Sequence, residues 1–160
     1  MKRPIAVFGA ALMVLTVGCR SEDVYESSTS YSVRGDAVKD GAFQRGWLPS
    51  LLPLSAHNIT ESHVIDSGEV WIEFYADRAD IDNFVAGCSK EEGHWTSVHR
   101  ARGRAEWWAQ RVKREGRLED GARHYRCPGM MHGHVESVAG VIVSSDRRRV
   151  WYVKLRMDER

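Results

Sequence analysis

The sequence lacks the local motifs that identify the best-known enzyme classes. No Gly-x-Ser-x-Gly elbow, His-Glu-x-x-His helix or phosphate-binding loop occurs in its 160 residues. Cysteine is scarce, with three residues, and none of them belongs to a Cys-x-x-Cys pair. These absences argue against serine hydrolases, zinc proteases, nucleotide-dependent enzymes and thioredoxin-like redox proteins. We therefore expect a non-enzymatic protein without a cofactor.

The N-terminus also lacks an apolar run long enough to cross a bilayer. A spanning helix needs about 20 apolar residues, whereas the uncharged stretch after Lys2 and Arg3 runs only from Pro4 to Val17. This pattern is typical of a secretory signal. Leu-Thr-Val-Gly before Cys19 resembles the bacterial lipobox, in which the thiol receives a diacylglycerol and the signal is cleaved before the cysteine. The alternative is an ordinary signal peptide followed by a chance cysteine.

The signal divides the chain into three expected parts. Residues 1–18 are the lipoprotein signal peptide, residues 19–35 a lipid-anchored flexible tether, and residues 36–160 a single folded domain. The tether is predicted because this segment is rich in polar residues and poor in aliphatic ones. Arg20 follows the lipidated cysteine, and the absence of aspartate there favours the outer membrane where the cell has one. Acyl chains such as palmitate then hold the protein on an envelope membrane.

Two cysteines remain once Cys19 is assigned to the lipid. In an oxidising compartment Cys88 and Cys127 favour one disulfide. It would close a loop of about 40 residues, which contributes roughly 3–4 kcal/mol on the chain-entropy model. A pair of metal ligands or a redox couple is the alternative.

Charge is unevenly distributed, although the whole chain carries a net charge of only +1. Residues 20–92 have 14 acidic and 6 basic side chains, a net charge of −8, whereas residues 93–160 have 8 and 15, a net charge of +7. Two halves that pack together and neutralise each other explain this pattern, and a basic face for anionic lipid or an acidic partner is the alternative. Nucleic acid is not an expected partner of an exported domain.

Adjacent tryptophans and a run of arginines mark a candidate partner surface. A helix cannot bury two neighbouring rings on one narrow face, so one of the pair is expected to be exposed to a protein, glycan or membrane. The surface comprises Trp107, Trp108, Arg147, Arg148 and Arg149.

The hydropathy pattern predicts an α+β domain. Alternating apolar residues and turn signals indicate strands over 58–66, 69–75, 123–127, 135–144 and 149–156. Apolar residues at helical spacing indicate helices over 36–46, 77–88 and 105–115. Residues 89–104 lack either period and are expected to form a loop. The expected fold is an antiparallel sheet of about five strands, built from hairpins, with about three short helices.

The segment GWLPSLLPLSAHNITESHVIDSGEVWIEF (residues 46–74) resembles the signature of small bacterial exported proteins with a YbbD-like head domain. The tryptophan pair at 107–108, Tyr125 with Cys127, and Trp151 with Tyr152 also fit this resemblance, which extends over most of residues 36–155. The resemblance implies export and a coherent fold, and it implies no particular activity.

Two groups of polar residues are weighed as chemical sites. His63 with Asp66 and Glu69 suits acid–base chemistry across a hairpin, but a hydrogen-bonded strand histidine beside a polar turn is the favoured interpretation. A soft-ligand set suits copper, with chance occurrence in an exposed loop as the alternative. This set is Met130, Met131, His132 and His134, which His94 and His99 would join if their loops converge.

The sequence thus indicates a lipid-anchored envelope protein that binds, protects or supports another envelope component. The expected partners are the membrane through its lipid, and an envelope protein, a glycan or anionic lipid. A periplasmic copper-binding or small-ligand-binding protein is the alternative.

Overall fold

Seven antiparallel strands form one sheet in the described part of the computed structural model, which covers residues 26–91, 106–111, 121–128 and 138–155. Their order across the sheet is β1-β2-β3-β7-β6-β5-β4. The bounds are β1 Glu26–Val33, β2 His57–Val64, β3 Val70–Tyr75, β4 Ser89–Glu91, β5 Arg123–Pro128, β6 Val138–Val143 and β7 Arg149–Leu155. The predicted α+β class and antiparallel sheet are confirmed.

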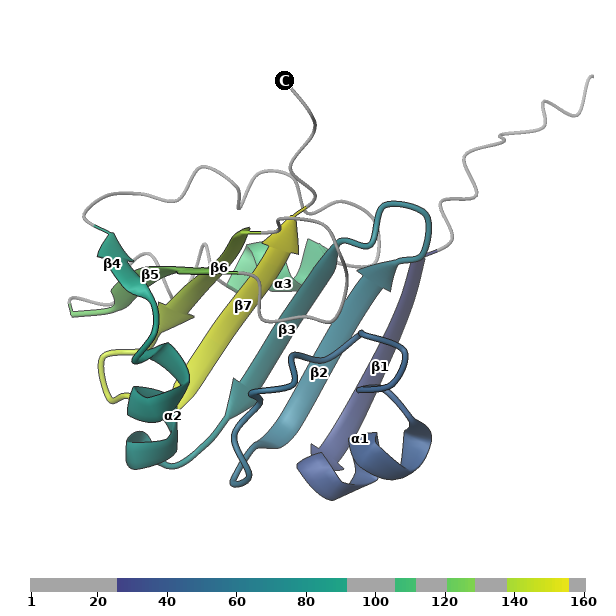
Figure 1. Cartoon of the computed structure of the whole chain (residues 1–160), viewed down its shortest axis with the longest axis horizontal. Coiled ribbons are helices and arrows are strands. Elements are labelled where there is room, and N and C mark those ends of the chain that lie inside the picture. Colours follow the sequence, from purple (N-terminus) through teal and green to yellow (C-terminus); the bar gives the residue numbers. More distant parts are fainter. Residues whose placement is uncertain (1–25, 92–105, 112–120, 129–137, 156–160) are drawn as a thin grey trace, which may run out of the picture.

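Helices lie on both sides of this sheet. Figure 1 shows α1 (Arg34–Asp40) and α2 (Arg78–Val85) in front of it and α3 (Glu106–Arg111) behind it. Side chains alternate between the two sides along each strand. Val70, Ile72 and Phe74 of β3 accordingly join the core beneath α1 and α2. Trp71 packs with Trp108 in a second core on the α3 side.

The connection from β1 to β2 covers the front of the sheet. Gly41 ends α1 in the left-handed conformation (φ 77°), where its N–H donates to the carbonyls of Ala37 and Val38. Two turns follow, in which Leu52 donates to the carbonyl of Pro49 and Ala56 to that of Pro53. The side chains that this connection adds to the core are Ala37, Ala42, Leu48, Leu52 and Ala56.

Two strands were not expected from the sequence. The predicted tether over residues 19–35 is wrong from Glu26 onward, because Glu26–Val33 pairs with β2 along its length as an edge strand. Ser89–Glu91 lies in the predicted loop over residues 89–104 but pairs with β5. The described sheet therefore has seven strands instead of about five, since backbone pairing orders two segments that lack a strong apolar period.

The helix bounds also differ from those predicted. α1 begins at Arg34 and ends at Asp40, so it is shifted from the expected range of 36–46. Val33 is its N-cap, and Asp36 lies inside the first turn instead of capping it. The predicted helix over 77–88 is observed as Arg78–Val85. No described helix is both long and apolar enough to cross a membrane.

A disulfide joins Cys88 to Cys127, as predicted, with the two Cα atoms 4.3 Å apart. Cys88 immediately precedes β4, and Cys127 lies in β5. The bond therefore fastens the short edge strand β4 to its neighbour. Persistent structural disulfides form in oxidising compartments, so this bond indicates an extracytoplasmic protein.

Candidate functional site

The candidate site lies on strands β1–β3, on the face of the sheet that also carries α3. The strand register places Ser30 opposite Thr60, Thr60 opposite Glu73, and Glu73 opposite Trp151. Residues directly opposite one another in a sheet point to the same face. These four side chains therefore form one row across four strands, although up to 121 positions separate them in the sequence.

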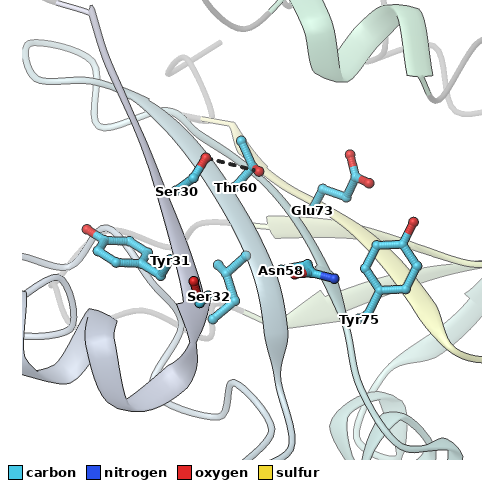
Figure 2. Close-up of a pocket in the computed structure, with 8 residues that line it drawn as sticks. Ser30, Tyr31, Ser32, Asn58, Thr60, Glu73 and Tyr75 are labelled. Atoms are coloured by element: carbon cyan, nitrogen blue, oxygen red, sulfur yellow. Dashed lines mark hydrogen bonds between the residues drawn. The ribbon is translucent and has the colours of Figure 1, made fainter.

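One end of this row opens into a depression of about 300 Å³. The hydroxyls of Ser30 and Thr60 lie 3.3 Å apart at one side of it, and Glu73 and Tyr75 rise at the other (Figure 2). We call this depression the hydroxyl face. Its lining consists of Ser30, Tyr31, Ser32, Asn58, Ile59, Thr60, Glu73 and Tyr75.

An irregularity in β2 shapes the hydroxyl face. The register between β2 and β3 shifts between His57 and Thr60, as in a β-bulge. Asn58 lies in this shift with a left-handed backbone (φ 48°), a conformation that asparagine tolerates better than most residues. Bulges re-aim side chains, and here the amide of Asn58 is directed toward Tyr75 (Figure 2).

An ion pair neutralises the carboxylate of the hydroxyl face. The Nε–H of Arg149 donates to Oε1 of Glu73 at 2.8 Å, and only 2% of the Glu73 side chain is exposed. The same guanidinium lies 5.3 Å from the ring centre of Tyr75 and 4.6 Å from that of Trp151. Arg149 therefore holds Glu73 and packs on two aromatic rings at once.

Beside the hydroxyl face, on the same side of the sheet, a chain of hydroxyl groups connects β1 and β2 to α3. The indole N–H of Trp107 donates to Oγ of Ser62 at 2.9 Å, and Ser62 donates to Oγ of Ser28 at 2.9 Å. Trp107 is half-buried. Trp108 is fully buried, and its indole N–H donates to the carbonyl of Ile72 at 3.0 Å. Trp108 is therefore a core residue, and the prediction that places it on a partner surface is wrong.

The three arginines of the predicted partner surface do not share one surface. Arg147 forms an ion pair with Asp82 of α2, in front of the sheet. Arg149 lies on the opposite face with Glu73, and only 16% of its side chain is exposed. Arg148 is exposed between them. A basic patch made of the whole run is therefore contradicted, because the side chains diverge to both sides of β7.

A buried polar pair lies on β2, on the opposite side of the sheet from the hydroxyl face. Nδ1 of His63 lies 3.0 Å from Oε2 of Glu61, and the two residues are 2% and 0% exposed. Trp47 stacks on the imidazole with 4.0 Å between ring centres, and Arg45 lies over the outer side of Trp47. No hydrogen-bond partner for Oε1 of Glu61 or Nε2 of His63 occurs within the described residues.

Burial raises the pKa of Glu61, and the hydrogen bond from His63 opposes that rise. Because both side chains of the pair are buried, neither is accessible to a ligand at the surface. The predicted grouping of His63 with Asp66 and Glu69 is not formed, since Asp66 is exposed in the turn and Glu69 accepts a hydrogen bond from Ser67. The favoured interpretation of a hydrogen-bonded strand histidine is confirmed.

Several predicted site residues lie outside the described residues. These are the lipidation site Cys19 and the copper-ligand set Met130, Met131, His132 and His134, together with His94 and His99. Within the described ranges no group of three or more His, Cys, Asp or Glu side chains is arranged to hold a metal ion.

The hydroxyl face was not predicted from the sequence, because its polar lining residues are common residue types on strands that are separate in the sequence. The one available signal was the spacing of Glu61 and His63, which puts both on one face of a strand. The same alternation places Thr60 and Ser62 on the opposite face.

Comparison with known protein families relates the first part of the described chain to one of them. A search of curated proteins finds no match, and neither does a search of solved structures. The family model described as the YbbD head domain matches residues 23–75, which include β1, α1, β2 and β3. This range contains every residue that lines the hydroxyl face, together with Trp47, Glu61 and His63. The resemblance expected from the sequence is thus confirmed over residues 23–75, where the chain carries the YbbD head domain pattern.

Proposed function

We propose that this protein is a lipid-anchored, extracytoplasmic binding module without catalytic activity. It holds another component of the cell envelope on the hydroxyl face. The observation that carries this proposal is the depression itself, in which exposed hydroxyl and amide groups surround a neutralised carboxylate and an aromatic ring. The nearby pair of Glu61 and His63 is buried, so the depression offers a ligand hydrogen bonds and contact with an aromatic ring.

The position of the anchor supports this function. Glu26, at the start of β1, lies seven positions after Cys19. Because an extended chain spans at most about 3.6 Å per residue, a lipid on Cys19 would keep β1 within roughly 25 Å of the membrane surface. The disulfide supports export. The hydroxyl face would then meet envelope components that lie next to the membrane.

We expect Cys19→Ala to move the protein from the membrane fraction to the soluble fraction. The intact mass of the wild-type chain, extracted gently from membranes, should show the loss of residues 1–18 and a gain of diacylglyceryl and acyl groups. An uncut chain without added lipid would contradict the anchor. Two or more acyl chains bind a membrane stably. The Cys19→Ala variant carries none of them, so its partition should differ clearly from that of the wild type.

Binding is tested by co-sedimentation of the purified full-length chain with the native envelope fraction, in the Cys19→Ala background so that the lipid does not itself carry the protein to the membrane. Ser30→Arg places a long cation in the hydroxyl face, and we expect it to lower the bound fraction at least tenfold. Asn83→Arg is the matched control, because Asn83 is exposed on α2, in front of the sheet. Equal sedimentation of the two variants and the Cys19→Ala parent would show that the hydroxyl face does not bind the envelope.

A further inference from the structure

We infer that the hydroxyl face is a carbohydrate-binding site for a neutral, hydroxyl-rich oligosaccharide. This inference rests on the proposed function and names the partner of the same site. It follows from three properties of the lining: its hydrogen-bonding groups, its aromatic ring and its charge.

The hydrogen-bonding groups of the lining match those of a sugar. Ser30, Ser32 and Asn58 are exposed, and Thr60 is half-buried beside them. Hydroxyl groups donate and accept, and an amide offers both functions on one planar group. Sugar hydroxyls and N-acetyl groups need partners of both kinds. A short row of such side chains can therefore replace the water around one or two sugar units.

Tyr75 provides an apolar surface beside these groups. Its ring is half-buried at the edge of the depression, 5.9 Å from the ring of His57 between centres. The Arg149 guanidinium also contacts the ring, which restrains it. Aromatic side chains combine a large apolar face with a polar tip. The C–H groups of a pyranose ring can pack on this face while its hydroxyls reach Asn58 and Thr60.

The charge of the lining disfavours an anionic ligand. Glu73 is the carboxylate of the site, and Arg149 neutralises it through a hydrogen-bonded ion pair. Binding of anionic lipid relies on clusters of uncompensated lysine and arginine. The lining contains no such cluster. A neutral ligand therefore fits the site better than a phospholipid headgroup.

The size and polarity of the depression disfavour a protein partner. Stable protein interfaces are built around an apolar centre, whereas hydroxyl, amide and carboxylate groups dominate this lining. A depression of about 300 Å³ lies at the lower end of small-ligand sites. Its groups are also fixed in place by the β2 bulge, the Ser30–Thr60 contact and the Glu73–Arg149 pair. Such pre-organisation lowers the entropic cost of binding a flexible oligosaccharide.

The test separates carbohydrate from protein in the envelope co-sedimentation. One envelope sample is treated with periodate, which cleaves the vicinal diols of sugars, and a second with proteinase that is then inactivated. We expect binding of the Cys19→Ala chain, which lacks the lipid anchor, to survive proteinase and to fall at least tenfold after periodate. Binding that survives periodate and is lost after proteinase would overturn the carbohydrate inference and leave the proposed function standing. Absence of binding to untreated envelope would overturn both.

A soluble probe then places the sugar on the hydroxyl face. Ligand-observed NMR with cellotetraose, whose sugar units carry the vicinal diols that periodate cleaves, should show saturable binding to the wild-type chain and to Asn83→Arg. We expect Tyr75→Ala and Ser30→Arg each to weaken that binding at least tenfold. Ser30→Arg leaves the aromatic packing intact, so it keeps the test valid if Tyr75→Ala fails to fold. Unchanged affinity in a folded Ser30→Arg variant would overturn the inference.

Discussion

Replacing His63 with alanine is expected to lower the free energy of unfolding by about 3–5 kcal/mol at pH 7.5, because it removes one partner of a buried pair. Glu61, which is 0% exposed, would lose the hydrogen bond at Oε2. Trp47 would lose the ring on which it stacks at 4.0 Å. Urea unfolding followed by tryptophan fluorescence measures this loss.

The loss in His63→Ala should depend on pH in a defined direction. Burial raises the pKa of Glu61, and His63 lowers it by hydrogen bonding and by charge. Without His63, the pKa of Glu61 in the folded state rises further. A group whose pKa is raised on folding contributes stability below its unfolded pKa, and that stability is lost as pH rises through the folded pKa. The free energy of unfolding of the variant should therefore be closest to that of the wild type near pH 5, and the difference should grow toward pH 8.

Two further variants assign this effect to the buried pair. Glu61→Gln in the His63→Ala background removes the ionisable carboxyl, so it should recover part of the stability and flatten the added pH dependence. His57→Ala is the matched control, because this histidine is exposed on the same strand, and it should change stability by about 0.5 kcal/mol. An identical pH profile with and without the Glu61→Gln change would rule out Glu61 as the source.

The strands that could be predicted are those with a strong apolar period. β3 alternates Val70, Ile72 and Phe74 on one face with Trp71 on the other, and both faces are buried. β2, β6 and β7 carry similar signals. The pairing of Cys88 with Cys127 could also be predicted, since two cysteines allow one connectivity.

The edge strand and the site could not be predicted, for two different physical reasons. β1 reads Glu-Ser-Ser-Thr-Ser-Tyr-Ser-Val and has few apolar side chains to bury. Its order comes from pairing with β2, which is a tertiary effect. The hydroxyl face depends on the register between β1, β2, β3 and β7 and on a bulge at Asn58. Such long-range register leaves no local trace in the sequence.

Removing the disulfide is expected to lower the free energy of unfolding by about 3–4 kcal/mol, because the unfolded chain regains the freedom of a long loop. Cys88 and Cys127 are 39 positions apart, and the chain-entropy cost of closing such a loop sets this magnitude. The double variant Cys88→Ala/Cys127→Ala should show the loss in urea unfolding. Wild-type protein in excess reductant should show a loss of similar size.

Removing the disulfide should also loosen one edge of the sheet, at β4, more than the rest. Cys88 precedes the three-residue strand β4, whose described sheet partner is β5. Amide hydrogen exchange should therefore accelerate in β4 in the double variant, at denaturant concentrations where β2 and β3 remain protected. The double variant is also the control for the reductant, which should leave its free energy of unfolding unchanged. An unfolding midpoint that does not respond to reductant would contradict a closed Cys88–Cys127 bond, and with it the argument that the domain matures in an oxidising compartment.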